Sequence, residues 1–411
     1  MFNKVKYQGE LWFPDFPDQR CFCILSFVNN RIELETNLVS PDRYSQKNVY
    51  PLIFGIFNGL GCLTFVDCEL GSDSTGMIRS AIYIPKYCFT HIEHIVNPKD
   101  LQIKQFRVTG IGLGKWINLK FQFDKSLLKT NNEVTHNFDI QELGLQIKLN
   151  SWITSSVSHE QISLKKSGNI EFSFCSPINV KELLDYYTKT KKLIQFLNGK
   201  SGKFSFFNFK CPQHEDWSAI YFKELMFIDS KFEYFSIDFD KILEHLPLLF
   251  TKIFTDEKFY FCVNRLLDNQ VEGQLTHSKR FTNSISSFEG YCKLYIDDIK
   301  NSKLSNFLQN NQQEIIELSG IDEEYFSKFC SKIISSRDYY VHANINNNNI
   351  FSDFELLYIS FLLDILVASN LLKQIGVSQE ILNMIAHRSR ENYKGIQSFN
   401  RELRQDTFFD H

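Results

Sequence analysis

The sequence lacks the features that identify several large classes of protein. Its 45 Lys and Arg are outnumbered by 48 Asp and Glu, and the formal net charge of −3 excludes the global basic field that marks many nucleic-acid-binding proteins. A protein that binds only a few nucleotides needs no more than a local basic patch, so that narrower class stays open. The ten cysteines stand singly, without the regular spacing of a secreted disulfide scaffold.

Long hydrophobic runs are also missing. The most apolar stretch, from Leu356 to Leu372, is interrupted by Asp364 and other polar residues, and it is shorter than the roughly 20 apolar residues of a typical membrane span. We expect a buried helix there and no membrane contact. The first residues lead directly into strand-like sequence without a signal-peptide core, which predicts a cytoplasmic protein.

Motifs for several kinds of chemistry are absent. There is no Gly-x-Ser-x-Gly elbow, and the glycine-rich segment 110–114 (GIGLG) lacks the Lys-Ser/Thr ending of a phosphate-binding loop. That segment is predicted to be a turn. The pairs Cys211/His214 and Cys21/Cys23 have no second pair at zinc-binding spacing. We therefore predict no metal and no cofactor.

What is present divides into two parts. Up to about residue 239, short apolar or alternating runs are separated by Asn and Gly turn signals, which predicts antiparallel strands in a sandwich or barrel-like body. Residues 165–169 (KKSGN) are predicted to be the turn of a hairpin. A helical stripe from Val180 to about Leu197 ends at Asn198-Gly199 and predicts one helix within this part.

After residue 239 the apolar period changes to 3.6, which predicts an up-and-down helical bundle. The expected helices are 239–254 with a break at Pro247, 257–267, 277–299, 304–318, 323–341, 353–372 and 379–386. The predicted fold class is therefore α+β. The predicted domains are a β-rich region at 1–240, with a subdivision near 140–160, and an all-α bundle at 241–411.

One short segment carries candidate chemistry. Residues 337–342 read RDYYVH, with Arg337 and His342 separated by four residues near the predicted end of a helix. Arginine holds a phosphate bidentately, and histidine moves protons near neutral pH, so the two together would cleave RNA without a metal. A chain of this length contains about one such spacing by chance. The surrounding sequence must therefore support the assignment.

The helical pattern places Arg337 next to a carboxylate. Arg337 follows Ile333 and Ile334 on the apolar stripe of its helix, and Glu289 lies within the stripe of the helix at 277–299. Residues on the facing stripes of two packed helices are natural partners, so an Arg337–Glu289 ion pair is predicted. An alternative interpretation is structural: the ion pair fixes helix register, and His342 is a helix-end residue stabilised by the dipole.

The spacing of the motif raises a geometric difficulty. Residues five apart on an α-helix point about 140° away from each other, so Arg337 and His342 share a face only if the helix ends or loosens between them. The intervening residues are mediocre helix formers, which favours loosening. The second solution is a homodimer in which two copies of the segment share one cleft.

Residues from about 277 to 342 resemble a HEPN domain (higher eukaryotes and prokaryotes nucleotide-binding), whose signature is Arg, a polar residue, a few further residues and then His. The stretch 280–291 (RFTNSISSFEGY) is similar to the first long helix of the ApeA-type branch. The segments 9–15 (GELWFPD), 53–55 (IFG) and 63–68 (LTFVDC) resemble the N-terminal part of the same branch. The similarity thus extends over most of the chain.

The resemblance implies an anti-phage, abortive-infection endoribonuclease that needs no metal and acts as a homodimer or higher homo-oligomer. It assigns His342 to proton transfer, Arg337 to charge stabilisation and Asp338 to orientation of one of them, with Glu289 in support. The expected products are a 2′,3′-cyclic phosphate and a 5′-hydroxyl, which require the 2′-hydroxyl of RNA.

Partners follow from the same reading. RNA is the expected substrate, with tRNA as one candidate, and a phage-derived protein is a candidate trigger for the N-terminal region. Positive residues in two places are candidate RNA contacts: Lys191, Lys192, Arg388, Arg390, Lys394 and Arg401. The competing hypothesis is a non-catalytic scaffold, in which the helical part only dimerises and the β-rich part recognises a phage or host partner.

Overall fold

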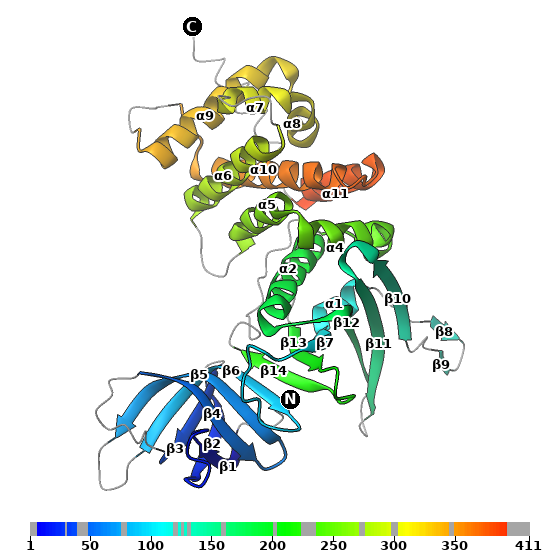
Figure 1. The fold of residues 1–411 in the computed structure, drawn as a ribbon. Helices are drawn as coiled ribbons and strands as arrows, with labels where there is room; N and C mark the ends of the chain where they lie inside the picture. The colour runs from blue at the N-terminus through cyan, green and yellow to red at the C-terminus, as the bar shows by residue number, and fades with distance from the viewer. Residues whose placement is uncertain are drawn as a thin grey trace. The chain divides into compact units, whose positions relative to one another are not determined.

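A computed structural model describes residues 6–28, 31–38, 48–74, 80–117, 122–124, 127–129, 133–157, 162–199, 204–222, 236–270, 276–296, 303–344 and 349–392. The chain forms two compact units (Figure 1). The β-rich unit comprises Met1–Tyr187 and Gly202–Ile228, and the helical unit comprises Thr188–Ser201 and Asp229–His411. The predicted combination of an antiparallel β-rich part and an all-α part is confirmed.

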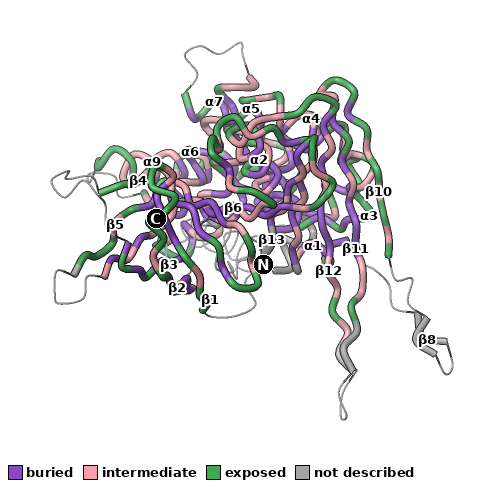
Figure 2. The backbone as a smooth tube through the Cα atoms, turned by 60° about the horizontal axis from the view of Figure 1, so that its bottom comes forward, coloured by how far each residue is buried: buried purple, intermediate pink, exposed green. Residues whose placement is uncertain are grey.

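The first six strands close into an antiparallel barrel: β1 (Lys6–Trp12), β2 (Cys21–Val28), β3 (Arg31–Thr36), β4 (Val49–Phe57), β5 (Gly61–Ser74) and β6 (Ser80–His91). Each strand pairs with two others in the ring β6-β3-β2-β1-β4-β5, and β5 pairs back with β6. Buried positions alternate with more exposed ones along β3, as expected for a strand with one face toward the interior, and Figure 2 colours the backbone by this burial. Leu11, Leu25, Leu34 and Phe65 are fully buried in the barrel interior.

The sheet continues beyond β6 through six further strands, in the order β14-β13-β7-β12-β11-β10. Their bounds are β7 (Ile103–Gly110), β10 (Glu133–Ile140), β11 (Leu145–Val157), β12 (Ile162–Ile178), β13 (Phe204–Lys210) and β14 (Ser218–Phe222). Strands β8 (Gln122–Asp124) and β9 (Leu127–Lys129) form a separate pair. One face is aromatic: Phe106 stacks on Phe172 at 4.3 Å between ring centroids, and Tyr187 of helix α2 (Val180–Asn198) stacks on Phe207 at 5.0 Å.

Two local predictions in the β-rich unit are wrong for one shared reason. The segment predicted as a turn, 110–114, begins helix α1 (Ile111–Trp116), and the predicted hairpin turn at 165–169 lies inside the continuous strand β12. A Cβ on Gly114 would lie only 2.4 Å from the backbone of Ser167. Glycine therefore serves close packing of α1 on β12, and not chain reversal.

The helical unit contains α3 (Phe239–Ile242), α4 (Leu246–Thr255), α5 (Glu257–Leu267), α6 (His277–Tyr295), α7 (Leu304–Asn310), α8 (Gln312–Ser319), α9 (Phe326–His342), α10 (Asp353–Lys373) and α11 (Gln379–Asn392). Pro247 lies in the first turn of α4, where its missing N–H costs nothing, so the predicted break occurs just before it. Short 3-10 turns separate several of the helices.

Helix α10 is the central element of the helical unit. It packs against α5, α6 and α8, and Ser352 caps its first turn in a capping box with Glu355. Among the described helices it alone is long and apolar enough to span a membrane, but 83% of that apolar window is buried inside the protein. This burial is typical of the core helix of a soluble protein.

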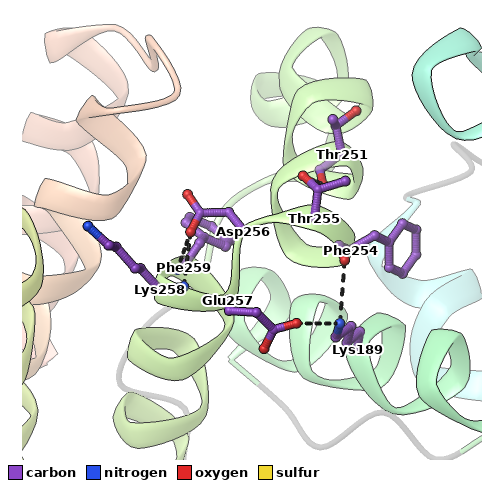
Figure 3. Close-up of polar contacts among 8 residues, drawn as sticks. All are labelled: Lys189, Thr251, Phe254, Thr255, Asp256, Glu257, Lys258 and Phe259. Carbon is purple, nitrogen blue, oxygen red and sulfur yellow. Dashed lines mark hydrogen bonds and ion pairs between the residues drawn. The ribbon is translucent and has the colours of Figure 1, made fainter.

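The last part of α2 belongs to the helical unit, where one lysine secures the corner between α4 and α5 (Figure 3). Asp256 caps α5 by accepting two backbone N–H groups at its start. The Nζ atom of Lys189 donates to the carbonyl oxygen of Phe254 at 3.4 Å and contacts the Glu257 carboxylate at 3.1 Å. The buried ammonium thereby satisfies a carbonyl at the end of α4.

Candidate active site

Helices α6 and α9 position the Arg337 side chain. The inward stripe of α9 contains Phe326, Phe329 and Ile333, and the facing stripe of α6 contains Phe281 and Phe288. Burial of these apolar side chains fixes how the two helices pack. Because Arg337 follows Ile333 by four residues, the same packing directs its side chain toward α6.

Two carboxylates hold the guanidinium of Arg337. Its Nη2 atom lies 3.1 Å from Oε1 of Glu289, and its Nη1 atom lies 3.0 Å from Oδ1 of Asp338. The arginine and Glu289 side chains are only 25% and 16% exposed, so water screens their attraction less than on an open surface. The ion pair that the helical pattern predicts between Arg337 and Glu289 is therefore present.

The arrangement leaves hydrogen-bonding capacity for an anion. Guanidinium carries five N–H donors in a rigid plane, and the two carboxylates fix the orientation of that plane. The remaining donors suit the paired oxygens of a phosphodiester. The two carboxylates therefore fix the guanidinium of Arg337 while N–H donors stay open to an anion.

His342 lies in a different environment. It is the last residue of α9 and is exposed. Ala343 ends the helix in the left-handed conformation (φ 54°, ψ 33°), and its N–H donates to the Asp338 carbonyl oxygen. The helix therefore continues through the whole motif. The prediction that it loosens between Arg337 and His342 is wrong, because a single left-handed cap supplies the turn only after the histidine.

The geometry of α9 consequently separates the two groups. Five residues of α-helix place their side chains about 140° apart and about 7.5 Å apart along the axis. Arg337 faces α6, whereas His342 projects from a different side of the helix end. One α9 helix alone therefore does not direct both groups at the same phosphate.

Two apolar side chains are exposed at the ends of α9 and α10. Val341 is 43% exposed in the last turn of α9, and Phe354 is 70% exposed in the first turn of α10. The ends of α9 and α10 are neighbours. Burial raises the pKa of Tyr340 most, Tyr339 adds to the shift, and the Asp353 carboxylate of α10 is close enough to raise it further. At the start of α6, Nδ1 of His277 lies 3.2 Å from Oδ2 of Asp353.

A pocket of about 310 Å³ opens beside Arg337. Its lining comes from α6, α7 and α9 and comprises Glu289, Lys293, Lys303, Leu304, Ser305, Phe307, Ile334, Arg337 and Asp338. The two lysines were not among the predicted site residues. Lys293 was detectable in principle, since it lies four residues after Glu289 and so on the same face of α6. Lys303 precedes α7 and gave no periodic signal.

Lys191 and Lys192, two of the other predicted RNA contacts, are not among the residues that line this pocket. Lys191 and Lys192 are half-buried on α2; burial lowers the pKa of Lys192, and Asp268 offsets part of that shift. Arg388 and Arg390 lie in the last turns of α11. Lys394 and Arg401 fall outside the described residues. Within the described ranges, no three His, Cys, Asp or Glu side chains come together as a metal site.

Two protein-family models together match nearly the whole chain. The model described as ApeA N-terminal domain 1 matches residues 6–254, and the model described as Apea-like HEPN matches residues 248–381. The second match contains Arg337, Asp338, His342 and Glu289, together with both pocket lysines. No curated protein and no solved structure matches the chain significantly.

Proposed function

The chain belongs to the ApeA family of HEPN-domain proteins, and on that premise we propose that it is an anti-phage endoribonuclease that cleaves RNA without a metal. HEPN domains are generally ribonuclease-like, and this one retains an arginine and a histidine at the signature spacing. The observation that carries the proposal is the guanidinium of Arg337, oriented by two carboxylates at the mouth of a pocket. A surface arginine with no role would not need such fixation.

The proposed reaction is an internal transesterification. His342 accepts the proton of the 2′-hydroxyl as that oxygen attacks phosphorus, and the bond to the 5′-oxygen breaks. A proton returned to the leaving 5′-oxygen completes the step and gives a 2′,3′-cyclic phosphate and a 5′-hydroxyl. Arg337 stabilises the charge that develops on the phosphorane. Asp338 and Glu289 orient Arg337 and do not exchange protons.

We further propose that the working enzyme is a homodimer. Since one α9 helix directs Arg337 and His342 to different sides, a second copy is the simplest source of the missing group at each site. Val341 in the last turn of α9 and Phe354 in the first turn of α10 are exposed and are suited to burial between two copies. This proposal makes the composite site a prerequisite for catalysis.

The β-rich unit has a proposed role in sensing infection. It contains a pocket of about 480 Å³ lined by charged and aromatic side chains that include Arg31, Asp67, Lys86 and Tyr221. Asp67 holds a positive φ of 50°, a strained conformation of the kind found at functional sites. Exchanging the charges with Asp67→Lys and Lys86→Glu should abolish protection against phage while purified protein still cleaves RNA. Loss of both protection and RNA cleavage would instead indicate misfolding. If both are retained, the pocket has no role in sensing.

Within this proposal the enzyme acts in the bacterial cytoplasm, where RNA such as tRNA is available, and a phage-derived protein supplies the trigger. The competing function is a non-catalytic scaffold, in which the Arg337–Glu289 ion pair only fixes the packing of α6 against α9. The two hypotheses differ in one result: the scaffold should tolerate a change at His342, and the enzyme should not.

The decisive experiment is incubation of total bacterial RNA with purified protein in excess EDTA, beside His342→Ala and Arg337→Ala. Cuts that end in a cyclic phosphate, and that are absent from both folded variants, would establish the proposed chemistry. If wild-type protein cleaves no RNA, the assay is repeated with extract from infected cells, which supplies the trigger. Absence of cleavage in that assay as well would favour the scaffold.

A further inference from the structure

We infer that the pocket beside Arg337 is a subsite for one nucleotide of single-stranded RNA, with Lys293 and Lys303 as its phosphate-binding residues. The inference rests on the proposed function, because the nucleotide is the neighbour of the one that is cleaved. The pocket shares Arg337, Asp338 and Glu289 with the candidate active site. A chain seated on the guanidinium therefore has its next nucleotide at the pocket.

The charges of the pocket favour an anion. The carboxylates of Glu289 and Asp338 both contact Arg337, so one positive charge faces two negative ones. Lys293 and Lys303 add two more positive charges. Neither lysine forms an ion pair with any of the described residues. The pocket carries a net positive charge in a chain whose own charge is −3, which is the local basic patch that a short RNA contact requires.

The apolar part of the lining favours a nucleotide over a bare phosphate. Leu304 and Phe307 line the pocket and are buried, and Ile334 of α9 contributes a third apolar side chain. A lining that combines apolar side chains with two lysines matches a base or ribose attached to a phosphate. The volume of about 310 Å³ is near the lower end of the roughly 300–1,000 Å³ of small-ligand sites. That size suits one nucleotide, and splayed bases are available only in single strands.

The first test measures binding without cleavage. The probe is a fluorescein-labelled 12-nucleotide RNA with 2′-O-methyl groups throughout, and anisotropy is read at several salt concentrations with the full chain. The variants are Lys293→Gln/Lys303→Gln and Ser305→Trp, which fills the pocket from an exposed position without changing charge. The matched control is Lys279→Gln/Lys328→Gln, which removes the same charge from α6 and α9 outside the pocket.

The inference predicts that both pocket variants weaken binding about tenfold or more, while the control binds within about twofold of wild type. The slope of log K against log salt should decrease by about 1.4 for the lysine variant, since each phosphate contact on a single strand contributes about 0.7. Wild-type affinity in both pocket variants would overturn the inference. So would weakening by the lysine changes alone with Ser305→Trp unaffected, because that result describes surface attraction without an occupied pocket.

The second test separates this inference from the proposed function. If wild-type protein cleaves RNA in a His342-dependent manner, the lysine variant should raise KM with little change in kcat. An unchanged KM would overturn the subsite and leave the ribonuclease intact. If no condition yields cleavage, but the pocket variants still bind the 2′-O-methyl RNA more weakly than wild type, then the proposed chemistry fails and the nucleotide subsite stands.

Discussion

The two ends of the same motif differ in how the fold treats them. Arg337 is half-buried, faces α6 and is held by two carboxylates within about 3 Å. His342 lies about 1.4 turns further along α9, exposed at the helix end next to the exposed Val341. The fold has thus completed the surroundings of the arginine and left those of the histidine open. Under the proposed function, Arg337 then supplies the phosphate contact of one site, and His342 supplies proton transfer to the site of a second copy.

The largest expected effect comes from removing the open end. His342→Ala should lower RNA cleavage by about 10²–10⁴-fold, the usual contribution of a general acid or base. Its free energy of unfolding should stay within about 0.5 kcal/mol of wild type, since an exposed side chain is lost. Initial rates and urea denaturation measure the two quantities. A substantial loss of stability would show that His342 is structural and would erase the contrast.

Replacing Arg337, the enclosed end of the motif, should lower both the cleavage rate and the free energy of unfolding. We expect Arg337→Ala to lower cleavage by about 10²–10³-fold, as loss of one charge-stabilising group does. It should also destabilise the protein by about 1–2 kcal/mol, because Glu289 is left half-buried without its cation. Arg337→Ala/Glu289→Ala is the matched control and should recover part of that stability without activity. Equal stabilities for the arginine and histidine variants would contradict the contrast.

Mixing the two inactive variants tests whether each site is shared between two copies. If each site takes Arg337 from one copy and His342 from the other, a mixed dimer of His342→Ala and Arg337→Ala contains one intact site. Random pairing makes half of the dimers mixed, so an equimolar mixture after unfolding and refolding should regain about a quarter of wild-type activity. No recovery, despite mixed dimers detected by native mass spectrometry, would place both groups within one chain.

The smallest effect concerns the residue that ends α9. Ala343 occupies the left-handed conformation at φ 54°, which costs a non-glycine residue about 1 kcal/mol. Ala343→Gly should therefore stabilise the chain by about 0.5–1 kcal/mol in urea denaturation. Cleavage should not change, because His342 keeps its place in the helix. A marked fall in activity would mean that a rigid helix end positions the histidine. Lys279→Gln serves as the neutral surface control.

The local sequence was sufficient to predict the enclosed end of the motif. Apolar residues at 3.6 spacing fixed the faces of α6 and α9, so the Arg337–Glu289 ion pair followed from periodicity alone. The open end was not predictable in the same way. The residues between Arg337 and His342 are poor helix formers, yet the helix continues, because packing of α9 outweighs their weak intrinsic preference. Lys303 became visible only when α7 was placed beside α6 and α9.

Glycine and register limited the prediction of the β-rich unit. The segments at 110–114 and 165–169 have the composition of turns, and each instead serves the close packing of α1 on β12. That use depends on a partner that is distant in sequence. Closure of the barrel depends similarly on β6 pairing with both β3 and β5, which no local pattern encodes. The boundary at residue 240 and the catalytic roles stay predictions.

Closure of the barrel also has a consequence for association with other chains. Because β5 returns to β6, the twelve-stranded order has a single terminal strand among the described residues, β10 (Glu133–Ile140). A terminal strand offers unpaired backbone groups to a foreign strand, which makes it the place where strand addition or aggregation begins. β10 contains two carboxylates, Glu133 and Asp139, and charged side chains on a terminal strand oppose such pairing. The β-rich unit thus presents one terminal strand among its described residues, and that strand is protected by charge.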